Sequence, residues 1–174
     1  MAAIFRTFGP FDLERDGDEL AATALDDFWA SEGGNLKLAK AIGVYILAVK
    51  ASKNATPVPW YVGKTDKGFQ QRLSEHGATY RKILTGSTTG TLQLFLIARQ
   101  SPSGTAHRKP AKNALGTIDK LETLLIGSCL NKNKDLRNDK KKKLWEMRVP
   151  GFLGDTQDNM TADAKGLSQM LKSK

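Results

Sequence analysis

Cysteine is almost absent from this sequence, which has one, Cys129, among 174 residues. A single thiol excludes a disulfide framework within the chain and a cysteine-based zinc site. No run of about 18 apolar residues is present, the length that a transmembrane helix needs. The first residues also lack the apolar core of a signal peptide. These absences lead us to expect a cytoplasmic protein that does not cross a membrane.

Acidic residues are few relative to basic ones, with 18 against 27, so that the net charge is +9. Such an excess favours a polyanionic partner, and nucleic acid is the most common one. A basic fold whose lysines merely face the solvent fits the charge equally well. Apolar residues make up 40% of the chain. Composition and length together suit one compact domain that buries its own core.

Apolar periodicity and turn residues predict an α+β fold, with helices flanking one small central antiparallel or mixed sheet. The expected order is β-β-α-β-α-β after an N-terminal helix. Strands are expected at residues 43–49, 60–63, 91–98 and 144–149, and helices at residues 16–29, 68–84 and 118–131. We expect Gly33 and Gly34 to end the first helix. The chain would then comprise an N-terminal helical arm (1–40), a central domain (41–154) and a polar C-terminal tail (155–174).

Several polar side chains occur where the pattern predicts a core. Arg72 and His76 lie four residues apart on the apolar side of one predicted helix, and Glu122 interrupts the apolar stripe of the next. A carboxylate in such a stripe is costly unless a cation or hydrogen-bond donors meet it. Tyr45 and Tyr61 lie on neighbouring strands, so the five side chains could converge on one side of the sheet. That set suits phosphate chemistry: arginine grips phosphate oxygens, a carboxylate holds Mg²⁺, and a tyrosine orients or deprotonates water.

Each of these residues has a structural interpretation when it is taken alone. Tyr45 and Tyr61 could be core aromatics whose hydroxyls reach water. His76 could be a structural histidine, and Arg72 could form an ion pair with Glu75 or Glu122. Their combined spacing is what favours a catalytic site.

That spacing resembles the GIY-YIG nuclease family. The matching elements, in chain order, are Gly43-Val44-Tyr45, Tyr61-Val62-Gly63 followed by Lys64, then Arg72, His76, Glu122 and Asn138. Arg72 follows Tyr61 by eleven residues and His76 follows Arg72 by four, as the family pattern has them. Asn131 and Asn133 are alternatives to Asn138. The resemblance covers residues 43–138. Valine replaces the central isoleucine of both tripeptides, and the connection at residues 46–60 is longer than the family's usual hairpin.

The resemblance implies a metal-dependent endonuclease that hydrolyses DNA phosphodiester bonds, on duplex or branched DNA, with one Mg²⁺ or Mn²⁺ ion. Tyr45 would contact or deprotonate the attacking water, and the charges of Arg72, Lys64 and the metal would favour its phenolate. Tyr61 would help to position the nucleophile, assisted by Lys64. Arg72 would stabilise the charge that grows on the scissile phosphate.

The remaining matched residues would complete that site. His76 would form a hydrogen bond with a tyrosine hydroxyl, Glu122 would bind the metal, and Asn138 would shape the lower wall. Only one carboxylate is expected on the convergent face, which favours a one-metal over a two-metal scheme.

A dense cationic run follows the predicted metal-binding helix. Its members are Lys132, Lys134, Arg137, Lys140, Lys141, Lys142 and Lys143. We interpret the run as a clamp on the DNA backbone, which would give affinity without sequence preference. The alternative is a solvated surface turn.

Two other functions fit parts of the same pattern. One is a catalytically silent nucleic-acid-binding module on this fold, and the other is a structural or partner-binding domain with a polar core cluster. The complete set of Tyr45, Tyr61, Arg72 and Glu122 favours the enzyme, because a silent relative is expected to have lost at least one of them.

Overall fold

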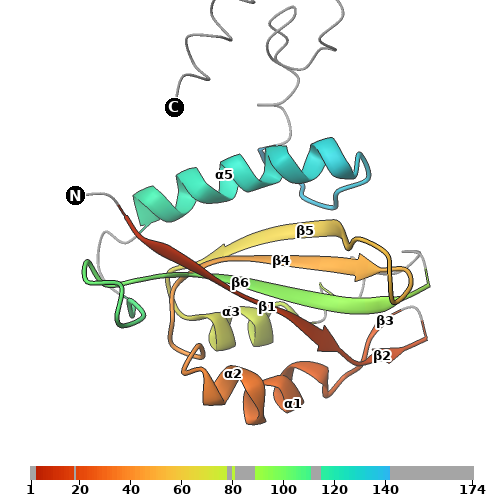
Figure 1. Ribbon diagram of the computed structural model, residues 1–174, viewed down its shortest axis with the longest axis horizontal. Helices are drawn as coiled ribbons and strands as arrows, with labels where there is room; N and C mark the ends of the chain where they lie inside the picture. The colour runs from red at the N-terminus through yellow and green to blue at the C-terminus, as the bar shows by residue number, and fades with distance from the viewer. Residues whose placement is uncertain (1–2, 18, 78–79, 81–88, 111–114, 142–174) are drawn as a thin grey trace, which may run out of the picture. The chain divides into compact units, whose positions relative to one another are not determined.

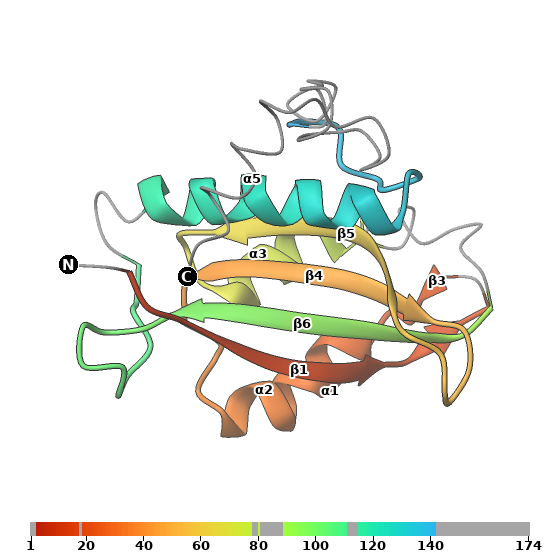
Figure 2. The ribbon, with the colours of Figure 1, turned by 45° about the horizontal axis from the view of Figure 1, so that its top comes forward.

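A four-stranded antiparallel sheet forms the centre of the computed structural model, which describes residues 3–17, 19–77, 80, 89–110 and 115–141. The strands are β1 (Phe5–Leu13), β4 (Gly43–Lys50), β5 (Val58–Thr65) and β6 (Thr91–Arg99). Figure 2 shows their order across the sheet, β1-β6-β4-β5, which makes β1 and β5 the two outermost strands. The chain divides into two compact units, Met1–Arg137 and Asn138–Lys174, and the sheet belongs to the first.

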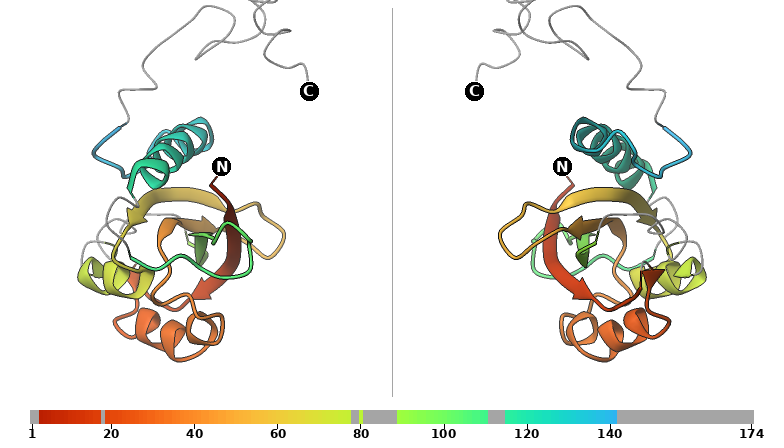
Figure 3. Two further views of the ribbon diagram at one scale, coloured as in Figure 1. Left: turned by 90° about the vertical axis from the view of Figure 1, so that its left-hand side faces the viewer. Right: turned by 90° about the vertical axis from the view of Figure 1, so that its right-hand side faces the viewer.

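Helices lie on both faces of this sheet (Figures 1 and 3). The long helix α5 (Leu115–Lys132) covers one face against β5 and β4. Helices α1 (Ala24–Ala30), α2 (Glu32–Asn35) and α3 (Phe69–Glu75) lie on the other. A short hairpin of β2 (Arg15–Asp16) and β3 (Glu19–Leu20) precedes α1.

Two apolar cores result from this layering because β4 is buried on both faces. Val44 belongs to the core under α5, with Ile118 and Ile126 of that helix. The next residue, Tyr45, belongs to the core on the side of α3, with Phe69 and Leu73. Alternation of side chains along a strand therefore assigns successive residues to different layers.

The structure confirms the α+β class and an antiparallel sheet. The strands expected at residues 43–49 and 91–98 and the helix expected at 118–131 are present as β4, β6 and α5, and β5 is longer than expected. Helix α3 covers the start of the helix expected at residues 68–84, and residues 78–79 and 81–84 of that helix lie outside the described residues. The strand expected at residues 144–149 and the tail at 155–174 lie outside the described residues. No described helix has both the length and the apolar character that crossing a membrane would need.

The N-terminal arm expected at residues 1–40 is not helical throughout, because residues 5–13 form strand β1 and pair with β6, and among its described residues only α1 and α2 are helical. The Gly9-Pro10 pair lies in the middle of this stretch. In the sequence alone it indicates that no strand is present, because proline cannot donate a ladder hydrogen bond. Here the register shifts between Phe8 and Phe11, so the pair sits in an irregularity on an outermost strand, where proline is tolerated. A Cβ on Gly9 would lie 2.6 Å from the carbonyl oxygen of Leu94 in β6. The glycine is therefore required by close strand packing.

The helix expected at residues 16–29 begins only at Ala24. Gly17 has a φ of +59° in the β2–β3 hairpin, a conformation that an α-helix cannot contain. Gly33 and Gly34 do not end a helix but lie within α2. A Cβ on Gly33 would come within 2.6 Å of the Trp29 ring, so this glycine lets α2 pack closely on α1.

Candidate active site

The two glycine-containing tripeptides meet across the β4–β5 pair. Tyr45 is directly opposite Gly63 in the antiparallel register. A Cβ on Gly63 would lie 2.2 Å from the Tyr45 ring, so the ring occupies the space that any other side chain would take. Gly43 has a matching role on the other side of β4, where a Cβ would lie 2.1 Å from the carbonyl oxygen of Ile97. Both glycines are thus explained by close approach to a neighbouring strand.

A short turn connects β5 to α3 and sets the direction of that helix. The Thr65 hydroxyl accepts hydrogen bonds from the backbone N–H groups of Lys67 and Gly68, at 3.1 and 3.2 Å. The N–H of Phe69 donates to the carbonyl of Ala41, which anchors the first turn of α3 beside the start of β4. With its first turn tied to the end of β5 and to the residues before β4, α3 holds its side chains against the tyrosine face of the sheet.

All three tyrosines of the chain gather on this face. The ring centroids of Tyr45, Tyr61 and Tyr80 lie 5.7 to 6.2 Å apart in every pairing. Tyr45 is 0% exposed and Tyr80 is 2% exposed, and their hydroxyls form a hydrogen bond with each other. Tyr61 is half-buried. Tyr80 was not among the predicted site residues. Its position eight residues after Arg72, at helical spacing, is the signal in the sequence that could have identified it.

Arg72 and His76 flank the tyrosines from α3. The Arg72 guanidinium contacts Nε2 of His76 and also forms a hydrogen bond with the Tyr45 hydroxyl. Because arginine only donates, His76 accepts through Nε2. The Nε–H of Arg72 is buried and has no acceptor in the part of the chain that the structure describes. The expected partner of His76 was a tyrosine hydroxyl; its contact is instead Arg72, with its ring 6.1 Å from that of Tyr80.

The electrostatics of this cluster keep the arginine charged and the histidine neutral. Burial lowers the pKa of Arg72, but the nearby Tyr45, Tyr80 and Tyr61 hydroxyls raise it, and the net shift is upward. Burial lowers the pKa of His76, and the charges of Arg72 and Lys67 lower it further, against an opposing effect of Glu75. Arg72 is therefore a permanent cation beside two neutral acceptors, Tyr45 and His76.

The surroundings of Tyr45 oppose ionisation of its phenol. Burial, followed by the neighbouring Tyr61, raises the pKa of Tyr45 far above 10, although the hydrogen bond with Tyr80 and the charge of Arg72 act in the opposite direction. Burial likewise raises the pKa of Tyr80. Both side chains are phenols at neutral pH.

Lys64 and Glu122 form a second polar cluster, on the opposite face of the sheet. Lys64 is paired with Val44, and its side chain turns toward α5. Its ammonium lies 3.4 Å from a carboxylate oxygen of Glu122 and forms an ion pair with Asp119, one turn earlier in α5. Glu122 is only 9% exposed, and the lysine charge offsets the free-energy cost of burying this carboxylate. Asp119 was not predicted as a site residue.

This arrangement corrects the expectation that the five key side chains converge on one side of the sheet. Tyr45, Tyr61, Arg72 and His76 do converge, but Glu122 comes from the helix on the other face. The two clusters meet at the outermost strand β5, which carries Tyr61 on one face and Lys64 on the other. Gly63, under the Tyr45 ring, is the residue next to Lys64, so the clusters are separated by the thickness of one strand.

The carboxylates Asp119 and Glu122 are the donors available for a metal ion. No group of three or more His, Cys, Asp or Glu side chains suited to a metal occurs within the described ranges. Mg²⁺ is commonly held by one or two carboxylates together with water and substrate phosphates. The donor set therefore fits an ion that is completed by a phosphate ligand, and it does not fit an all-protein metal cage.

The segment after α5 packs against β5. The Asn133 side chain donates to the carbonyl of Pro59 at 2.8 Å and accepts from the N–H of Asp135 at 3.0 Å. The N–H of Arg137 donates to the carbonyl of Trp60, and its guanidinium lies 5.6 Å from the Trp60 ring. Asn133 thus anchors this segment to the outermost strand.

The other predicted residues of this region are divided between the two units. Lys132 and Lys134 are exposed in the first unit, as is Asn131, whereas Asn138, Lys140 and Lys141 belong to the second. Asn138 is buried. Lys142 and Lys143 lie outside the described residues.

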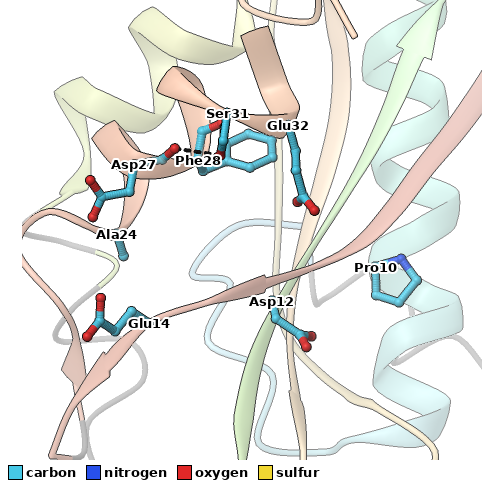
Figure 4. A pocket seen from close by; sticks show the side chains of 8 residues that line it. All are labelled: Pro10, Asp12, Glu14, Ala24, Asp27, Phe28, Ser31 and Glu32. Carbon is cyan, nitrogen blue, oxygen red and sulfur yellow. Dashed lines mark hydrogen bonds between the residues drawn. The ribbon is translucent and has the colours of Figure 1, made fainter. Parts of the chain in front are cut away.

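A separate pocket of about 440 Å³ lies between β1 and the helices α1 and α2 (Figure 4). Four carboxylates line it: Asp12 from β1, Glu14 from the connection between β1 and β2, and Asp27 and Glu32 from the helices. An acidic wall repels a phosphate backbone, and the pocket has none of the tyrosines or basic side chains described above. It is therefore not the site of phosphate chemistry.

No protein-family model matches this chain, and neither a curated protein nor a solved structure shows significant similarity to it.

Proposed function

We propose that this protein is a divalent-metal-dependent endonuclease of the GIY-YIG type, which hydrolyses DNA phosphodiester bonds with one metal ion. The observation that supports this most is the pairing of two clusters across β5: three tyrosines with Arg72 on one face, and Lys64 with Glu122 on the other. A phosphate at this strand would meet a cationic fork from one side and a carboxylate-held ion from the other.

Arg72 is the group proposed to hold the scissile phosphate. Its raised pKa keeps it charged at any physiological pH, and its planar fork suits two phosphate oxygens. The charge that develops on those oxygens in the transition state would be stabilised by a donor already in place. His76, as a neutral acceptor, holds the guanidinium from its other side.

Tyr61, and not Tyr45 as expected from the sequence, is proposed to act on the attacking water. Tyr45 is fully buried and keeps its proton, so it is unsuited to deprotonating a water molecule. Tyr61 is half-buried and touches both other tyrosines. We assign to Tyr61 the orientation of the attacking water and to Tyr45 the support of Tyr61 and Arg72.

Glu122 and Asp119 would hold the metal, which supplies Lewis-acid stabilisation of the phosphate and leaving oxygen when it is bound. Lys64 would have to share these carboxylates with the ion or turn toward the phosphate. In both cases the Lys64 ammonium would remain next to the reacting bond as a positive charge. The exposed Lys132 and Lys134, at the end of the same helix, would contact the DNA backbone.

Incubation of the purified chain with supercoiled plasmid and with branched DNA, with Mg²⁺ or with a chelator, tests the proposal. We expect nicked or linear products only with the ion. Glu122→Gln should lower the rate at least about a hundredfold while DNA binding remains, because loss of a metal ligand costs several kcal/mol of barrier. Asp27→Asn, in the acidic pocket, is the matched control and should cut at the wild-type rate. Equal rates for wild type and Glu122→Gln would refute a role for Glu122 in metal binding.

A catalytically silent DNA-binding module is the second candidate. The contact that favours it is the ion pair between Lys64 and Glu122, since a fixed ammonium competes with a metal for the same carboxylate. This candidate predicts DNA binding without cleavage by the wild-type chain under every metal condition.

A further inference from the structure

Tyr80 and Tyr45 are the two least exposed members of the tyrosine cluster. Its hydroxyl lies in the interior, where an unpaired hydroxyl costs free energy, and its hydrogen-bond partner is the Tyr45 hydroxyl. A phenylalanine at this position would fill the same space without that cost. The presence of two facing hydroxyls in an apolar core therefore calls for an explanation beyond packing.

The direction of the hydrogen bonds links this pair to Arg72. The guanidinium can only donate, so the Tyr45 oxygen accepts from it. If the proton of Tyr45 points to the Tyr80 oxygen, a lone pair of Tyr45 faces Arg72. Tyr80 then fixes the rotation of the Tyr45 hydroxyl, and thereby the direction of the lone pair that accepts from Arg72.

We propose that Tyr80 is a positioning residue that fixes the Arg72 guanidinium by orienting the Tyr45 hydroxyl. Arg72 is then held between two neutral acceptors, Tyr45 and His76, and its remaining donors are directed at a ligand. This inference adds a positioning residue to the proposed nuclease site. It rests on the proposed function for the cleavage experiment alone.

The cleavage experiment compares Tyr80→Phe in the full chain with Gln71→Ala, an exposed change at the α3 position next to Arg72. We expect Tyr80→Phe to lower kcat at least about tenfold with little change in KM, because a misplaced phosphate-binding group reduces turnover more than binding. Gln71→Ala should match wild type. In an Arg72→Lys background, Tyr80→Phe should cost almost nothing further, since both changes disrupt one interaction. Equal costs in both backgrounds would overturn the positioning role.

A second measurement does not depend on activity. The Nε–H resonance of Arg72, identified by its loss in Arg72→Lys, reports how the guanidinium is held. We expect Tyr80→Phe to shift or broaden this resonance, whereas Gln71→Ala leaves it unchanged. An unchanged resonance in a folded Tyr80→Phe protein would overturn the inference. If the wild-type chain cuts no DNA, the proposed function fails on its own, and the resonance decides the positioning role by itself.

Discussion

The Arg72 guanidinium can only donate hydrogen bonds, so each of its hydrogen-bond partners must accept. His76 accepts from one side and Tyr45 from the other, and neither neutralises the charge. Arg72 keeps its positive charge available, as a phosphate ligand requires.

Replacing Arg72 by lysine tests the geometry of this group separately from its charge. We expect kcat to fall by about a hundredfold or more, since one preorganised donor group is typically worth that factor. DNA affinity should change little and circular dichroism should be unchanged. Arg6→Lys, on the opposite outermost strand β1, is the control. Wild-type turnover in Arg72→Lys would show that only the charge matters.

His76 predicts a loss of stability in mild acid. Its folded-state pKa is lowered, first by burial and then by the charge of Arg72, so the unfolded chain binds the proton more readily. The stabilisation is present above the unfolded value of about 6.5 and is lost as the pH falls through the folded value. Urea unfolding at about pH 7.5 and about pH 5.5 measures the difference.

We expect the decrease in unfolding free energy toward acid to be smaller in His76→Gln than in wild type. His107→Gln, which removes the chain's other histidine, is the matched control. A decrease of wild-type size in His76→Gln would mean that other groups cause the acid sensitivity.

At the scale of elements, the β4–β5 pair is organised around the contact between Tyr45 and Gly63. The bulky ring lies flat over a residue without a side chain, which lets Tyr45 reach Tyr80 and Arg72. Gly63→Ala should therefore lower the free energy of unfolding by about 1–3 kcal/mol, because the added methyl overlaps the ring. Gly116→Ala, in α5 with open space around it, should be neutral or stabilising by up to about 1 kcal/mol. Unchanged stability of Gly63→Ala in urea would contradict the placement of the ring.

Helix α5 provides a second element-scale prediction through Cys129. Burial under the helix raises the pKa of this thiol to about 11, so almost none of it is thiolate at neutral pH. We expect a thiol-specific reagent to modify native protein very slowly and urea-unfolded protein at once. Rapid modification of the native chain would show that α5 separates readily from the sheet.

For the molecule as a whole, the net charge of +9 is the property expected to govern the DNA binding that the proposed function requires. Lys132 and Lys134 are exposed at the end of α5, the helix that carries Glu122. Changing both to glutamine should reduce the slope of log affinity against log salt by up to roughly 0.9 for each lost phosphate contact. Lys37→Gln, from the connection between α2 and β4, should leave the slope unchanged. An unaltered slope in the double variant would mean that these lysines only face solvent.

Local patterns predicted β4, β6 and α5, because periods of two and 3.6 residues are visible in neighbouring positions. They failed at the N-terminus. Gly9-Pro10 reads as a strand breaker, and only the partner strand β6 makes residues 5–13 a strand. Gly33 reads as a helix terminator, and only the adjacent Trp29 ring shows that it is a packing requirement.

The sequence alone determined which residues are chemically unusual, since a glutamate in an apolar stripe or an arginine at a set distance from a tyrosine is visible in one dimension. The tertiary structure decided which of them touch. It placed Glu122 across the sheet from Arg72, gave it Asp119 and Lys64 as neighbours, and buried Tyr45 against Tyr80. The physical reason is that contact between layers depends on strand order and register, which arise from pairing between residues far apart in the chain.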